Sequence, residues 1–306
     1  MSVSLSFWIG FNLFVFFMIL LDMKVFHRHS HEVGLKEALG WSAFWIILAL
    51  LFALGVYRYF GLSKTLEYLT GYVIEKSLSV DNIFVFLAIF SYFHVAPKYQ
   101  HKILFWGILG ALFFRAFFIL VGIKLIQMFH WTLYVFGAIL IYTGIKLAFQ
   151  KEEEIHPEKN PVLRLVQKLM PVTHDHQGGQ FFVRSPNNRL MATPLFVALI
   201  VVETTDILFA FDSIPAVLAV SLDPFIVYTS NVFAILGLRA LYFAVAGLMK
   251  KVRFLHFGLA FILAFAGMKI LISDYYKIPL PISLSVILGV LILTILISFL
   301  ADKKRI

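Results

Sequence analysis

The sequence contains no cysteine and few charged residues. Of its 306 residues, none is Cys and only 14% are Asp, Glu, Lys or Arg. The lack of thiols excludes disulfides and thiolate metal sites. Because soluble domains carry about 25% charged residues, the low charge excludes an ordinary soluble protein. Apolar side chains make up 61% of the chain and its mean hydropathy is +0.90, which indicates an integral membrane protein.

Apolar runs of membrane-spanning length recur along the whole chain. A helix needs about 20 predominantly apolar residues to cross the hydrocarbon core of a bilayer. We therefore predict an all-α polytopic membrane protein with about nine transmembrane helices. The predicted spans are Ser4–Leu21, Trp41–Tyr57, Leu69–Phe93, Ile103–Ile123, Trp131–Phe149, Pro194–Val220, Phe225–Leu248, Phe254–Ile272 and Ile282–Leu300.

Basic residues gather on alternate links between these spans. The link from Gln150 to Thr193 is rich in them, and the tail carries Lys303, Lys304 and Arg305. Since positively charged links stay in the cytoplasm, we expect the N-terminus outside and the C-terminus in the cytoplasm. The net charge of +9 then reflects topology. We expect the lipid bilayer as a partner, and no nucleic acid.

Ten charged residues fall inside the predicted spans. The acids are Glu75, Asp81, Glu203, Asp206 and Asp212, and the bases are Lys76, Arg115, Lys146, Arg239 and Lys269. A charge at the centre of a bilayer costs roughly 2.5–3.5 kcal/mol on insertion scales. These side chains must therefore face the protein interior, contact water or pair with one another.

An internal repeat relates the acidic spans. "RAFFILVG" (115–122) resembles "RALYFAVAG" (239–247), and "TGIKL" (143–147) resembles "AGMKI" (266–270). Each copy holds three spans, so the second copy would enter the membrane from the opposite side, as in many secondary transporters. The chain then divides into two N-terminal helices (1–68), a first three-helix unit (69–149), a cytoplasmic link (150–193), a second three-helix unit (194–273) and a C-terminal helix with its tail (274–306).

The buried acids and their polar neighbours offer oxygen ligands. The predicted metal ligands are Glu75, Asp81, Asn82, Glu203, Asp206, Asp212 and Ser213. The residues predicted to balance their charge are Arg115, Arg239, Lys146 and Lys269. Oxygen ligands suit Mn²⁺, Ca²⁺ or Mg²⁺, so we also expect a divalent metal ion as a partner. Pro215 predicts a kink that would turn Asp212 toward the other acids.

Three stretches carry a resemblance to a known family. "GYVIEKSLSVDNIFVFLAIFSYF", "FFVRSPNNRLMATPLFVALIVVETTDILFAFDSIPAV" and "DPFIVYTSNVFAILGLRALYF" resemble the TerC family of integral membrane proteins, in particular its Alx branch. The likeness covers nearly the whole chain and includes all five membrane-embedded acids. It implies a protein of the bacterial inner (plasma) membrane that exports Mn²⁺ from the cytoplasm, whereas ligand chemistry by itself indicates only a hard divalent cation.

Other interpretations remain open. The acids could pair with the buried bases and only fix helix packing. The protein could export another cation or a small organic solute, or act as a membrane scaffold that transports nothing. An intramembrane aspartyl protease also needs acids on facing helices, but the Gly-x-Gly-Asp signature is absent, and we expect no enzyme. The links "HRHSHE" (27–32) and "THDHQGG" (173–179) could collect metal before transport.

Overall fold

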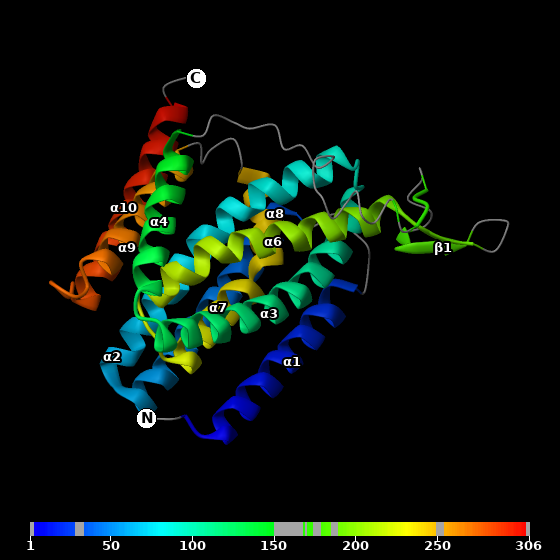
Figure 1. Cartoon of the computed structure of the whole chain (residues 1–306). Helices are drawn as coiled ribbons and strands as arrows, with labels where there is room; N and C mark the ends of the chain where they lie inside the picture. The colour runs from blue at the N-terminus through cyan, green and yellow to red at the C-terminus, as the bar shows by residue number, and fades with distance from the viewer. Residues whose placement is uncertain are drawn as a thin grey trace.

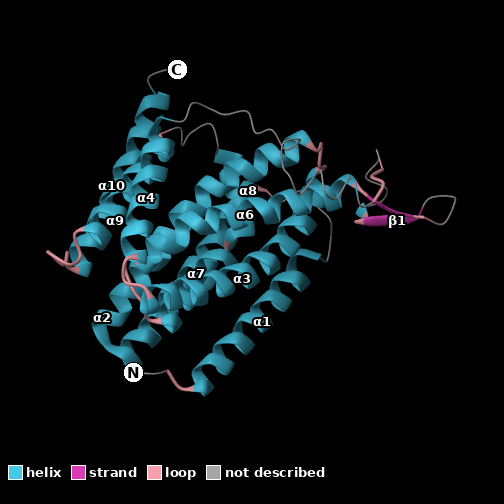
Figure 2. Cartoon of the chain, in the orientation of Figure 1, coloured by secondary structure: helices cyan, strands magenta, loops and turns pink. Residues whose placement is uncertain are grey.

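The structure is a computed structural model that is almost entirely helical (Figures 1 and 2). It describes residues 3–27, 34–149, 168, 170–173, 179–184, 189–248 and 254–303. The helices in these ranges are α1 (Leu5–His27), α2 (Leu35–Tyr92), α3 (Pro97–Met128), α4 (Thr132–Phe149), α6 (Pro194–Leu218), α7 (Pro224–Leu236), α8 (Leu238–Leu248), α9 (Leu255–Leu271) and α10 (Leu280–Lys303). One antiparallel hairpin pairs β1 (Phe182–Arg184) with β2 (Leu190–Ala192). The predicted all-α membrane fold is confirmed.

Helix α2 is too long to be a single membrane crossing. Its 58 residues would extend about 87 Å, against about 30 Å for a hydrocarbon core. The helix is interrupted at Gly61, whose φ of 81° lies in the region that glycine tolerates best. The break falls between the predicted spans Trp41–Tyr57 and Leu69–Phe93, so α2 accounts for both.

The predicted span Phe225–Leu248 forms two helices rather than one. Helices α7 and α8 meet at Gly237 and are bent by 44°. Within the described residues, five helices are long and apolar enough to cross a membrane, or six if this bent pair is one span, and α1 and α9 contain shorter apolar segments. By contrast, α6 continues as a helix through Pro215. The second unit is thus bent at Gly237, and the kink expected at Pro215 stays a prediction.

Helix packing brings the two predicted units together. Helix α4 packs along α9, α2 packs against α6, α7 and α8, and α3 packs against α6. In Figure 1, α4, α9 and α10 lie together on one side of the bundle, and α1 lies on the other. The acidic helices α2 and α6 are thus in direct contact in the interior.

The α4–α9 contact is reciprocal in sequence. A Cβ added to Gly144 would lie 2.7 Å from the carbonyl oxygen of Ala260, and one added to Gly267 would lie 2.6 Å from that of Gly137. Gly267 follows Gly144 by the same number of residues as Ala260 follows Gly137. An inverted repeat requires such an exchange of contacts, and the repeat itself stays a prediction.

Candidate functional site

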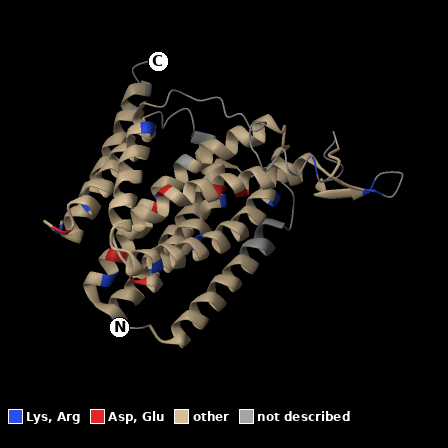
Figure 3. Ribbon diagram, viewed as in Figure 1, with Lys and Arg blue, Asp and Glu red and all other residues tan. Residues whose placement is uncertain are grey.

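Arg115 of α3 lies at the centre of the buried polar groups. Its guanidinium donates to the carboxylate of Glu75 on α2, to Oδ1 of Asp206 at 3.4 Å and to Oγ of Ser213 at 3.1 Å, both on α6. It also donates to Oδ1 of Asn231 on α7 at 3.3 Å. Arg115 is 2% exposed and Glu75 is fully buried. Figure 3 shows such acidic and basic residues within the helical body. We call these five residues the Arg115 cluster.

Three carboxylate oxygens around this cluster have no hydrogen-bond partner within the described part of the chain. They are Oε2 of Glu75, Oδ2 of Asp206 and Oε2 of Glu203. Glu203 lies one turn before Asp206 on α6, close enough for their charges to repel. The carboxylate of Glu203 occupies the space beside Gly110 of α3, where a Cβ would otherwise lie. A buried ion without a partner costs several kcal/mol. The guanidinium of Arg115 contacts two of these three acids, Glu75 and Asp206, so the group is receptive to a further positive charge.

Asp212 lies apart from the Arg115 cluster. It accepts a hydrogen bond from Oγ1 of Thr143 on α4 at 2.8 Å, and Lys146 on the same helix attracts it electrostatically. Because α6 is continuous, Asp212 projects from the opposite side to Glu203, nine residues earlier. Helix α6 is continuous through Pro215, and the structure does not bring Asp212 to the other acids.

The remaining predicted site residues take different places. Asp81 lies in α2, but its side chain is outside the described part of the structure. Asn82 is buried on α2, Arg239 is buried on α8 and Lys269 is half-buried on α9. The two histidine links fall largely outside the described residues, so any metal-collecting role for them stays a prediction.

No ready-made metal centre is formed among the described residues. Within them, no group of three or more Asp, Glu, His or Cys side chains is placed to hold a metal ion. The guanidinium of Arg115 lies between Glu75 and Asp206, where a shared cation would otherwise contact both. The predicted ligand set therefore stays a prediction, of which the structure gathers Glu75, Glu203, Asp206 and Ser213.

Two polar residues near these acids were not predicted from the sequence. Asn231 contributes to the Arg115 cluster, and Thr143 binds Asp212. Each is a polar residue inside an apolar run, so the signal was present. Many such residues only bond to the preceding turn of their own helix, as Thr229 and Ser230 do, and the sequence does not separate the two cases.

Comparison with known protein families identifies the family of the chain. The description "Integral membrane protein TerC family" fits residues 60–305. The chain belongs to the TerC family. The region that matches contains the Arg115 cluster and every charged residue predicted to lie inside a span. The buried polar groups are therefore part of the TerC domain itself.

Bacterial membrane proteins resemble the chain over nearly its full length. An uncharacterized membrane protein of Myxococcus xanthus is 51% identical over 97% of this chain and 92% of its own. A protein of Salmonella typhi, named as a candidate membrane-bound redox modulator, Alx, is 45% identical over 97% of this chain and 95% of its own. The protein of that name in Escherichia coli K12 is 44% identical over 97% of each chain. No solved structure matches the chain.

Proposed function

We propose that this TerC protein exports a hard divalent cation from the cytoplasm, with Mn²⁺ as the favoured ion. The observation that carries the proposal is the excess of negative over positive charge at and beside the Arg115 cluster. Glu75, Asp206 and Glu203 each bury an oxygen without a hydrogen-bond partner among the described residues, and Arg115 contacts two of these acids. A cation that visits the cluster would supply the missing positive charge, which a purely structural network would not need.

Ligand chemistry narrows the class of ion. Glu75, Glu203, Asp206, Ser213 and Asn231 offer carboxylate, hydroxyl and amide oxygens. Such hard ligands suit Mn²⁺, Mg²⁺ and Ca²⁺ better than Zn²⁺ or Cu⁺, which favour nitrogen or sulfur. The choice of manganese and the outward direction come from the resemblance to the TerC family.

The position of the cluster suits a carrier. It joins α2 and α3 of the first predicted unit to α6 and α7 of the second. In transporters with inverted repeats, the substrate site lies where the two copies meet, and broken helices border it. Helix α7, which contributes Asn231, ends at the 44° bend at Gly237.

Arg115 gives the cluster two states. With the guanidinium bound, Glu75 and Asp206 are partly neutralised when no ion is present. A divalent cation would compete for the same carboxylates and displace the guanidinium. Burying charged groups is tolerable only when each state supplies a partner, so exchange between arginine and metal would keep the acids paired through the transport cycle.

The relatives' name offers a second function, redox modulation, which no feature of the site favours. The chain contains no cysteine, so a redox role would not involve thiols of its own. Cation transport accounts for the buried acids directly, and we keep it as the conclusion.

The test is cation flux in proteoliposomes. We expect the purified protein to carry Mn²⁺ in preference to Ca²⁺ and Mg²⁺, and Asp206→Asn to abolish the flux. Asp274→Asn is the matched control, because it makes the same substitution outside the Arg115 cluster. Asp274 lies in the link after α9, and hydrogen bonds from Tyr134 and His130 lower its pKa, so it is also a charged carboxylate. Wild-type protein that carries none of the three ions, or flux that survives in Asp206→Asn, would contradict the proposal.

A further inference from the structure

A pocket opens at the end of the bundle where α6 is followed by α7. Its volume is about 610 Å³, and its polar lining comes from Lys64, Glu67, Ser221 and Asp223. Nζ of Lys64 lies 2.8 Å from Oε2 of Glu67 and 3.3 Å from Oδ2 of Asp223, and Ser221 donates to the same oxygen of Glu67. Two carboxylates share one ammonium group here, so the pocket has a net negative charge and attracts cations.

Two rows of residues lead from this pocket to the Arg115 cluster. Residues four apart in a helix lie on the same face, and both rows have this spacing. The rows are Glu67, Gly71 and Glu75 on α2, and Ser221, Val217 and Ser213 on α6 and the turn after it. They run antiparallel and span two helical turns, about 12 Å.

The rows meet at three levels. At the pocket, Ser221 is hydrogen-bonded to Glu67. At the far end, Glu75 and Ser213 both accept hydrogen bonds from Arg115. The acids at the two ends therefore lie on one continuous helix-to-helix seam, with a single level between them.

The middle level is closed by small residues in close contact. A Cβ added to Gly71 would lie 3.1 Å from Cγ1 of Val217 and 3.0 Å from Oγ of Ser230 on α7. Val217 is 1% exposed and Ser230 is fully buried. One valine side chain and one hydroxyl thus separate the pocket from the cluster along this seam.

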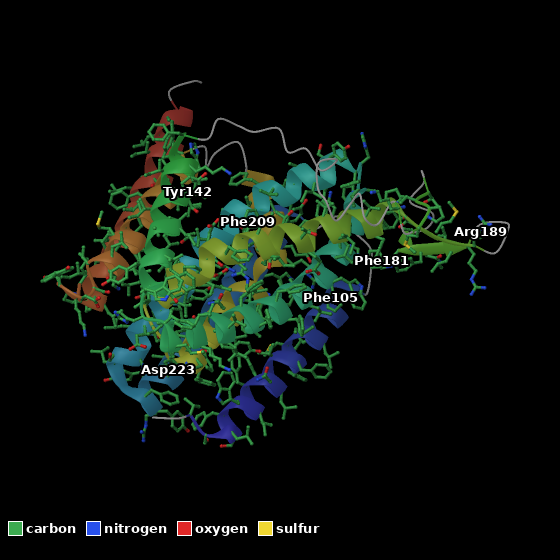
Figure 4. The ribbon with its side chains drawn as sticks, in the orientation of Figure 1. Phe105, Tyr142, Phe181, Arg189, Phe209 and Asp223 are labelled. Atoms are coloured by element: carbon green, nitrogen blue, oxygen red, sulfur yellow. The ribbon has the colours of Figure 1, made fainter. Side chains whose placement is uncertain are left out.

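The opposite end of the bundle is covered instead. Lys102 near the start of α3 donates to the carbonyl oxygen of Gly179 at 2.8 Å, and its Nζ lies 4.6 Å from the centre of the Phe181 ring. Tyr99 packs so closely on Gly179 that a Cβ there would clash with its ring. Figure 4 labels Asp223 and Phe181 at the two ends. Gly179 and Phe181 therefore cover part of the end that the topology prediction places in the cytoplasm.

We infer that the pocket at Glu67 and Asp223 is the outer mouth of the ion path, and that Gly71, Val217 and Ser230 form its gate. This inference rests on the proposed function. A hard divalent cation leaving the Arg115 cluster would pass between α2 and α6, and the negative pocket would receive it before release outside the cell.

The absence of native cysteine makes the path directly testable by thiol labelling. Single-cysteine variants Ser221→Cys in the pocket and Ser230→Cys at the gate are exposed to a membrane-impermeant cationic methanethiosulfonate, added to intact cells or to inside-out vesicles. The control is Ser283→Cys, a buried serine of α10 that lies in neither row. We expect Ser221→Cys to react from outside. Ser230→Cys should react at least about tenfold more slowly, because labelling must wait for the gate to open, and Ser283→Cys should stay unmodified.

A second pair of variants tests the gate itself. Val217→Ala combined with Ser230→Cys should speed labelling from outside, because the side chain that closes the seam is smaller. Val201→Ala is the matched control, since it removes the same atoms from a buried valine of α6 outside the rows. Equal acceleration by both substitutions, a pocket cysteine that reacts only from the cytoplasmic face, or a control serine position that reacts as fast as Ser221→Cys would overturn the inference.

Labelling reports access and not transport, so the two proposals can fail separately. If the labelling pattern holds but the wild-type protein carries no divalent cation, the proposed function fails and the path remains. If cation flux is normal but the pocket cysteine is not reached from outside, the path fails and the proposed function remains.

Discussion

At the scale of single residues, Arg115 is the partner of two buried acids. Its guanidinium pairs with Glu75 and Asp206, and all three side chains are buried. Removal of one partner from a buried ion pair leaves the other charge uncompensated, which costs about 3–5 kcal/mol, whereas removal of both partners can be nearly neutral. The pairing of these particular residues therefore matters more than the number of charges.

Arg115→Gln should destabilise the protein strongly, and the double variant Arg115→Gln with Glu75→Gln should recover part of the loss. The reason is that the second substitution removes one of the negative charges that the first leaves unpaired. Thermal unfolding in detergent measures both effects. Lys124→Gln, at an exposed position of the same helix, should leave the melting temperature unchanged, and a double variant less stable than Arg115→Gln would contradict the explanation.

At the scale of elements, the contact between α3 and α6 positions Glu203. A Cβ added to Gly110 of α3 would overlap the Glu203 carboxylate, whereas one added to Gly107, one turn earlier, would meet Cγ1 of Val202 at 3.4 Å, an ordinary contact. Small residues allow helices in a bilayer to approach closely. Here the close approach also leaves room for an acid between two helices.

Gly110→Ala should impair cation transport with little effect on stability. The new methyl group displaces the end of a flexible side chain, not the backbone, so the fold can absorb it while the carboxylate moves. The measurement is Mn²⁺ flux together with the melting temperature. Gly107→Ala should retain wild-type flux, and equal flux in the two variants would show that the position of Glu203 is unimportant.

At the scale of the whole molecule, the odd number of predicted spans places the two termini on opposite faces of the membrane. Helix α2 supplies two of these spans because Gly61 interrupts it, and α7 with α8 supplies one bent span. The outward position of the pocket at Asp223 depends on the same orientation. Topology and ion path are therefore linked predictions.

Reporter fusions test this orientation. Alkaline phosphatase, which is active only outside the cytoplasm, should be active when fused to the N-terminus and inactive when fused to the C-terminus. A fluorescent protein that folds only in the cytoplasm should give the reverse result. The expectation follows from the basic residues that gather on alternate links, which keep those links inside. Two termini on the same face would contradict it and would also reverse the assignment of the outer mouth.

The sequence by itself determined the class of protein, the approximate spans and the presence of costly charges inside them. Each of these depends on the local run of apolar residues and on the energy of moving each side chain into lipid. The recurrence of Arg115 and Arg239 in matching segments also needs no structure to be seen. The interruption of α2 at Gly61 agrees with spans placed by hydropathy.

Only the tertiary structure decided which charges meet. It placed Arg115 between Glu75 and Asp206, directed Asp212 toward Thr143, and bent the second unit at Gly237 while α6 continued through Pro215. The physical reason is that hydropathy fixes where a helix lies in the membrane but not how far it is rotated about its own axis. That rotation follows from the packing of each helix against its neighbours, and it determines which acids share a partner.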